Sequence, residues 1–239
     1  MEQHPVTWTY LIGIPHGPWE YLAIALLIMG VLLILALRAR SALQQDAVIV
    51  PDETLTARNV YELLVEAIGG LSDTVIGHGA AHYVPLLSSF FIFILCANLS
   101  GLLPGLTPPT SDFNITLALG IVSFIAFNYY GFKVQGIGYL KHFAGPILWL
   151  APLMFALELV GTLVRPVSLG LRLFGNLFGD HLVLEIFTGL TKVGVPVVFY
   201  MLGTLVSVIQ AFVFTLLSMI YIALAVAHHD EEHVEHAHH

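Results

Sequence analysis

Charged side chains are scarce in this chain. Asp, Glu, Lys and Arg make up 10% of the 239 residues, against about a quarter in soluble domains, and 57% of the residues are hydrophobic. This composition excludes an ordinary soluble domain and indicates a polytopic membrane protein. The 8 Lys and Arg residues form no basic stretch, so nothing in the sequence points to nucleic acid as a partner.

Cysteine and the common catalytic motifs are also missing. The single cysteine, Cys96, lies in an apolar run, which excludes a disulfide framework and a thiolate metal site. The sequence has no HExxH pair, no nucleophile elbow and no phosphate-binding glycine loop. We expect no bound cofactor. The N-terminus does not resemble a signal peptide, so we expect the first apolar run to remain in the mature protein.

Long apolar runs, in contrast, are abundant. The first covers residues 19–37 and is followed by Arg38 and Arg40. By the positive-inside rule, these arginines predict a cytoplasmic end for this span and an external N-terminus at residues 1–18. Residues 84–103 and 115–132 predict two further spans, each close to the ~20 residues that cross a ~30 Å hydrocarbon core.

Residues 54–79, between the first two of these spans, are more polar. Apolar residues such as Val60, Leu64 and Leu71 recur there at helical spacing, with charged residues between them. This pattern predicts an amphipathic helix on the cytoplasmic membrane interface. An ordinary helix of a small soluble loop is the alternative.

The last third of the chain contains two runs that are longer than one perpendicular span, residues 147–190 and 195–228. A helix from Leu153 to Leu190 would reach about 57 Å, nearly twice the thickness of the hydrocarbon core. We predict two long, strongly tilted helices that form a hairpin, with four short spans or re-entrant segments as the alternative. The expected fold is a single all-α integral membrane domain over residues 1–239, with about five transmembrane helices, one interfacial amphipathic helix and a tail at residues 229–239.

Arg172 lies well inside the first of these long runs. An arginine at bilayer depth costs roughly 2.5–3.5 kcal/mol on insertion scales. It cannot escape this cost by deprotonation, because the guanidinium pKa stays above about 12. An arginine that snorkels from a helix end to the headgroups is the alternative, but apolar sequence extends far on both sides of Arg172. The residue is therefore a candidate functional group.

Other polar side chains of this run fall on two faces of the predicted helix. Glu158, Arg165 and Arg172 are seven residues apart and share one face. His181 lies about 180° from Arg172, and Glu185 follows one turn later. Histidine and carboxylate side chains suit proton relay, whereas arginine supplies a fixed charge.

The last apolar run carries a narrow polar seam. Its members recur at spacings of three or four residues: Gly203, Ser207, Gln210, Phe214, Ser218 and Tyr221. Ordinary helix packing explains the small and hydroxyl side chains equally well. The larger amide of Gln210 needs a hydrogen-bond partner, which favours a specific role for it.

The tail after Ala227 is rich in His, Asp and Glu. This composition is compatible with metal binding. We favour a solvated tail, because the sequence offers no second cluster of ligands at a fixed spacing.

Residues 166–176 read PVSLGLRLFGN and contain Ser168, Arg172 and Asn176. This block closely resembles the signature of subunit a of rotary F-type ATP synthases. The similarity extends to Glu158, to residues 210–212 (QAF) and to residues 109–114 (PTSDFN), and the span pattern fits residues 19–228.

The resemblance implies a non-catalytic stator subunit that lies against a ring of c subunits and couples proton flow to rotation and ATP synthesis. Arg172 is then expected to face the ring carboxylates, with Asn176 and Gln210 near it. Glu158 is expected to line a half-channel to the cytoplasm, and His181 the outer half-channel.

One position departs from the family pattern. Bacterial members often carry a second titratable residue seven positions before the glutamine of the last helix, and here that position is Gly203. Glu185 or Asp180 is expected to replace it.

The resemblance also implies the surroundings of the chain. Its expected partners are the c-subunit ring, the b-subunit peripheral stalk, other ATP synthase subunits and the lipid bilayer of a bacterial inner membrane, with the C-terminus in the cytoplasm. The rival interpretation is an independent proton- or ion-coupled secondary transporter, although the sequence lacks the internal repeat that many transporters show.

Overall fold

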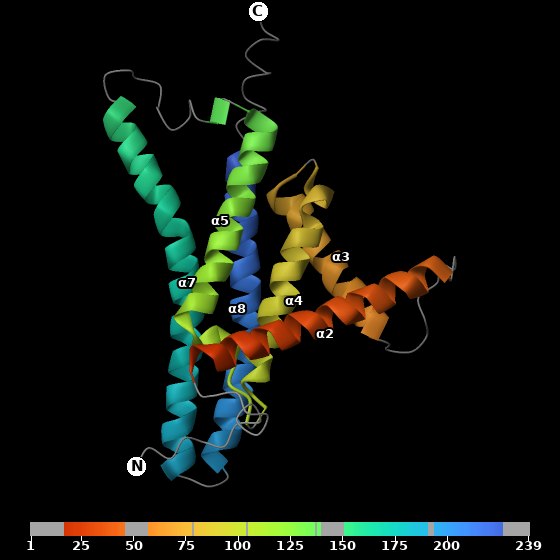
Figure 1. Ribbon diagram of the computed structural model, residues 1–239, viewed down its shortest axis with the longest axis vertical. Coiled ribbons are helices and arrows are strands. Elements are labelled where there is room, and N and C mark those ends of the chain that lie inside the picture. The colour runs from red at the N-terminus through yellow and green to blue at the C-terminus, as the bar shows by residue number, and fades with distance from the viewer. Residues whose placement is uncertain are drawn as a thin grey trace, which may run out of the picture.

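The protein is an elongated bundle of helices (Figure 1). A computed structural model describes residues 17–45, 57–77, 79–103, 105–136, 138–139, 151–190 and 194–226. The main helices are α2 (Pro18–Gln45), α3 (Ala57–Val75), α4 (Val84–Ser100), α5 (Phe113–Gln135), α7 (Ala151–Leu190) and α8 (Gly194–Val226), with short 3₁₀ helices η1 (Ala80–His82) and η2 (Pro109–Ser111). The secondary structure of the described residues is entirely helical.

Four of these helices are long and apolar enough to cross a membrane. The candidate spans are Pro18–Arg38, Phe113–Gln135, Pro152–Leu184 and Val197–Val226, and α4 is a shorter apolar helix. Many of their large apolar side chains face outward, which suits a lipid environment and not water. The prediction of an all-α integral membrane protein is therefore confirmed.

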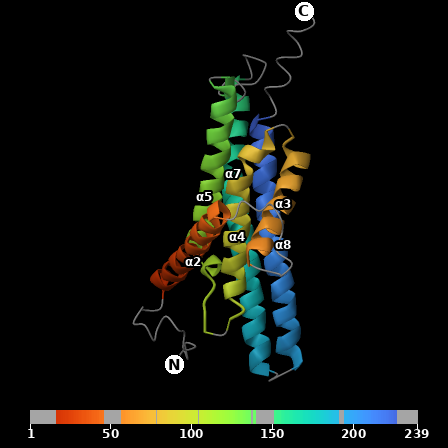
Figure 2. The ribbon, with the colours of Figure 1, turned by 90° about the vertical axis from the view of Figure 1, so that its right-hand side faces the viewer.

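The last third of the chain forms two long helices, as predicted, and not four short spans. α7 continues for 40 residues and contains Pro166 in its interior. α8 continues for 33 residues. The two helices run side by side in opposite directions and project together beyond the other helices at one end (Figures 1 and 2).

The centre of the bundle is formed by α4, α5, α7 and α8. Leu87 and Ile94 of α4, Phe127 of α5, Leu173 of α7 and Phe214 of α8 are almost completely buried there. They belong to one contiguous apolar cluster. This packing leaves one face of α7 buried and the other open.

Two glycines allow α5 and α7 to approach each other closely. A Cβ atom on Gly120 of α5 would collide with the carbonyl oxygen of Pro166. A Cβ atom on Gly170 of α7 would lie 3.0 Å from the backbone of Thr116 and Leu117. The contact fixes the rotation of α7 about its axis, so that Leu169 and Leu173 point into the core.

The remaining two helices lie at the periphery. α2 crosses the bundle obliquely (Figure 1), and its first turn is held by a hydrogen bond from the Thr107 hydroxyl to the buried Glu20 carboxylate, 3.1 Å long. α3 is the amphipathic helix of the predicted 54–79 stretch, and it packs Ile68 and Ser72 toward its neighbours α4 and α8. Its position at a membrane interface remains a prediction.

The α5–α7 contact generates a stability prediction. The Gly120→Ala variant should lower the free energy of unfolding by about 1–3 kcal/mol, because the added methyl group overpacks a backbone contact. Gly30→Ala is the matched control, since a Cβ atom at Gly30 meets nothing within 4 Å. Thermal unfolding of the detergent-solubilised assembly measures the difference, and equal midpoints for the two variants would contradict the close approach.

Candidate functional site

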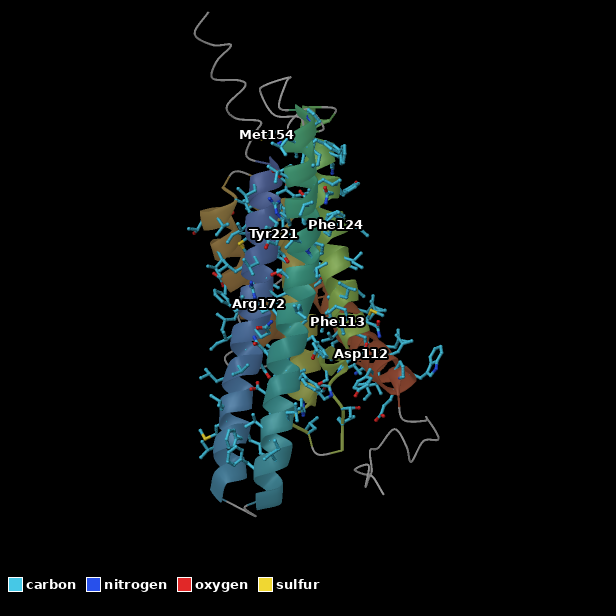
Figure 3. The ribbon with its side chains drawn as sticks, turned by 90° about the vertical axis from the view of Figure 1, so that its left-hand side faces the viewer. Asp112, Phe113, Phe124, Met154, Arg172 and Tyr221 are labelled. Carbon is cyan, nitrogen blue, oxygen red and sulfur yellow. The ribbon has the colours of Figure 1, made fainter. Side chains whose placement is uncertain are left out.

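Arg172 lies about midway along the α7–α8 pair (Figure 3). With a rise of 1.5 Å per residue, about 30 Å of helix extends from it in each direction. The neighbouring Leu173 is buried in the core, whereas Arg172 and Leu171 are exposed. The structure therefore directs the charged side chain away from the core, on a helix that is otherwise suited to lipid.

The guanidinium of Arg172 has no partner of its own in the part of the chain that the structure describes. No carboxylate there forms an ion pair with it, and no hydrogen bond is recorded for it. A charge in an apolar layer normally pairs with another group or faces a water-filled space. Arg172 is thus available to a carboxylate from outside this chain.

Asn176, one turn after Arg172, connects α7 to α8. Its side-chain amide donates a 2.7 Å hydrogen bond to the side-chain oxygen Oε1 of Gln210. Gln210 is only 4% exposed, so this bond satisfies an amide that would be costly to bury alone. The structure brings together two of the residues that the sequence singled out, beside the turn that carries Arg172.

Glu158 and Arg165, about four and two helical turns before Arg172, form an ion pair. Arg165 Nη2 lies 3.9 Å from Glu158 Oε1. The Arg165 guanidinium also lies over two aromatic rings, 5.9 Å from the Phe127 centroid and 5.3 Å from the Tyr221 centroid. The predicted shared face of Glu158 and Arg165 is therefore confirmed, and the aromatic partners of Arg165 come from α5 and α8.

Asp180 and His181 lie beyond Arg172, toward the C-terminal end of α7, and line a small cavity together with Gly203 of α8. Its volume of about 20 Å³ suffices for one water molecule. Oδ2 of Asp180 is buried and has no hydrogen-bond partner among the described residues. A Cβ atom on Gly101 would lie 2.7 Å from His181 Nε2, so the glycine makes room for the imidazole at the end of α4.

Two predicted residues add less. Ser168 lies one turn before Arg172 and is half-buried. The backbone of Glu185 is part of α7, but its side chain lies outside the described residues, so its proposed pairing with His181 stays a prediction. The described residues contain no cluster of three or more potential metal ligands, and the His-rich tail is not among them.

A buried polar network next to the cavity was missed by the sequence analysis. The Thr110 hydroxyl donates a 2.8 Å hydrogen bond to Asn98 Oδ1, and Asn98 Nδ2 donates to the carbonyl oxygen of Ser207 at 3.5 Å. Asn98 is 1% exposed and also lines the cavity. The side-chain amide of Asn98, in a run that is otherwise apolar, was the feature of the sequence that could have indicated this network.

This network generates a second stability prediction. Thr110→Val removes the donor to Asn98 Oδ1, and an unsatisfied buried acceptor costs about 1–3 kcal/mol. Thr74→Val is the matched control, because the Thr74 hydroxyl bonds only to a carbonyl of its own exposed helix turn. Thermal unfolding of the assembly should distinguish the two variants, and a Thr110→Val midpoint as high as that of the control would contradict the network.

Comparison with known proteins identifies the family of this chain. The family model for the ATP synthase A chain matches residues 21–223. The chain is 46% identical over 228 residues to ATP synthase subunit a of Bdellovibrio bacteriovorus, which covers 92% of this chain and 97% of that protein. It is 42% identical over 211 residues to ATP synthase subunit a of Geotalea daltonii, covering 88% and 89% of the two chains. The chain belongs to the ATP synthase A chain family.

Proposed function

We propose that this chain is the proton-translocating stator subunit of the membrane sector of a rotary ATP synthase. It provides two offset half-channels that load and unload carboxyl groups on a ring of c subunits, and Arg172 separates them. Family membership supports this function over an independent secondary transporter. The chain itself has no catalytic role in this proposal, and ATP chemistry belongs to other subunits of the complex.

The observation that carries the proposal is the outward-facing Arg172 without a carboxylate partner among the described residues. A ring carboxyl group crosses lipid only when it is neutral. Opposite Arg172 it is drawn to its charged form, because a nearby opposite charge favours ionisation. A proton must leave before the carboxyl reaches Arg172, and another must bind after it has passed.

The axial positions of Glu158 and His181 support two separate pathways. Along α7, Glu158 precedes Arg172 by about 21 Å and His181 follows it by about 14 Å. The two titratable groups therefore lie on opposite sides of the fixed charge. Each proton that crosses the whole membrane by these two pathways yields about 2.3 kcal/mol per 100 mV of membrane potential, which drives rotation.

We assign Asp180 as the partner of His181 in the outer pathway. Both residues line the same cavity, and the buried Oδ2 of Asp180 has no hydrogen-bond partner in the described part of the chain. Gly203 lines this cavity as well. It leaves space at the position where the family pattern described above has a second titratable side chain. A water molecule in the cavity can connect the carboxylate to the imidazole.

The proposed surroundings follow from the same function. The partners are other subunits of an ATP synthase, and more specifically the c ring at the Arg172 face and the b-subunit stalk. The membrane is the bacterial inner membrane, with the N-terminus outside and the C-terminus in the cytoplasm. In this orientation Glu158 belongs to the cytoplasmic pathway and His181 to the outer one.

Substitution of Arg172 tests the fixed charge. Arg172→Ala should abolish ATP-driven proton pumping and raise the passive proton leak. Arg172→Lys should also lose most pumping, because an ammonium is a point charge without the planar fork and loses its proton more readily when buried. Pumping is measured in inverted vesicles that contain equal amounts of assembled complex.

Arg38→Lys, at the end of the first candidate span, is the control for the conservative change. Near-normal pumping by Arg172→Lys would show that any cation suffices at this depth, and the role assigned to the guanidinium would be wrong.

Labelling from each side of the membrane tests the two pathways. Cys96 is the single native cysteine, so Cys96→Ala provides a cysteine-free background. In it, Glu158→Cys should react with an impermeant maleimide added on the cytoplasmic side, and His181→Cys with the reagent added outside. Equal reaction of both variants from one side only would eliminate the assignment of separate pathways.

A further inference from the structure

Arg165 is a second arginine within a candidate span of α7, and the proposed function assigns it no task. Its environment differs from that of Arg172. The Arg165 guanidinium lies over the rings of Phe127 and Tyr221, whereas Arg172 has no recorded partner among the described residues. Contact with two aromatic faces stabilises a cation that is partly removed from water. The two aromatic contacts therefore stabilise the Arg165 guanidinium in this position.

The aromatic pair that holds Arg165 belongs to a rigid frame. The Phe127 and Tyr221 centroids are 5.8 Å apart, and Phe127 is 1% exposed. On one side of the rings a 2.8 Å hydrogen bond joins the hydroxyl groups of Ser123 and Ser218. On the other side Gln135 Nε2 donates a 2.9 Å hydrogen bond to the Ala225 carbonyl. These contacts tie α5 to α8 above and below the guanidinium.

The contact with Glu158 is close enough for attraction but too long for a direct hydrogen bond. Nη2 and Oε1 are 3.9 Å apart, beyond the 2.7–2.9 Å of a charge-assisted bond. The two side chains are 29% and 39% exposed, so the described chain does not enclose the carboxylate. A carboxylate that is tightly hydrogen-bonded to its partner exchanges a proton less readily, because the partner stabilises its charged form. A carboxylate attracted at this distance keeps its position and can still exchange a proton.

The other polar groups around the pair come from α5, α8 and the segment after α5. Tyr139 is buried, and its hydroxyl donates a 3.0 Å hydrogen bond to Asn128 Oδ1. The pKa of Tyr139 is raised, and burial of the phenol is the largest cause. The nearby Arg165 charge lowers this pKa, and the Glu158 charge raises it. Tyr139 is therefore a neutral hydroxyl at ordinary pH. Tyr221 contacts Arg165 with its ring. Among the described residues, Glu158 supplies the carboxylate that lies near Arg165.

We propose that Arg165 is a positioning residue for proton transfer: its guanidinium, clamped by Phe127 and Tyr221, holds the Glu158 carboxylate in its pathway in a form that can exchange protons. This inference rests on the proposed function, because it assumes that protons pass Glu158. It assigns the two arginines of α7 different tasks. Arg172 acts on carboxyl groups of the ring, and Arg165 acts on a carboxyl group of its own helix.

A double-mutant cycle in the assembled complex tests the proposal. Arg165→Gln should slow ATP-driven proton pumping in proteoliposomes by roughly three- to tenfold, as the loss of a partly exposed charge contact allows. Arg165→Lys, which keeps a cation over the aromatic rings, should retain most of the pumping rate that Arg165→Gln loses. In a Glu158→Gln background, Arg165→Gln should cause no further slowing, because the group that it positions is gone.

The outcomes separate positioning from packing. Equal slowing by Arg165→Gln in both backgrounds, or failure of Arg165→Lys to restore the rate, would assign Arg165 to packing alone and overturn the proposal. If Arg165→Gln does not assemble, Tyr221→Leu replaces it in the cycle, with Tyr221→Phe, which keeps the ring, as the comparison. Tyr221→Leu should then slow pumping more than Tyr221→Phe, and only while Glu158 is present.

The same cycle distinguishes the inference from the proposed function. If Glu158→Gln slows pumping but Arg165→Gln does not, only the inference fails. If Glu158→Gln leaves pumping unchanged in a normally assembled complex, protons do not depend on Glu158 and the cytoplasmic pathway itself is wrong.

Discussion

A permanent positive charge in an apolar layer must meet a negative group or water, and the arrangement of this bundle determines which. The close contact of Gly120 and Gly170 with the opposing backbones fixes the rotation of α7. That rotation buries Leu169 and Leu173 and leaves Arg172 on the open face. The Asn176–Gln210 hydrogen bond then holds α8 beside the same region of α7. The charge remains unpaired within the described chain because the helix packing directs it outward.

The same helix shows how context decides what an arginine does. Arg165 and Arg172 are seven residues apart and start from nearly the same face. At Arg165, aromatic side chains from α5 and α8 are within cation–π distance, and Glu158 is near. At Arg172 the described chain offers no comparable contact. One position is satisfied within the subunit, and the other has no partner among the described residues.

Periodicity predicted much of this structure, because apolar length and helical spacing are local properties. The two long helices and the Glu158–Arg165 face follow from them. Long-range contacts do not. The Asn98–Thr110–Ser207 network joins residues from three distant segments, and the fit of His181 against Gly101 depends on where α4 ends. α4 ends at Ser100, earlier than the predicted 103, and Gly101, which caps the helix, is a local signal that the prediction did not use.

In the proposed outer pathway, the cavity beside His181 accommodates a change in the position of the titratable groups. Proton transfer through water requires titratable atoms around a shared water site and does not require one particular backbone position. Here Gly203 on α8 and Gly101 directly after α4 remove side-chain volume, while α7 supplies both His181 and Asp180. Adjacent residues on a helix point about 100° apart, so two such side chains line one cavity only if it wraps around part of the helix. The cavity meets this condition, since α4, α7 and α8 all contribute to its lining.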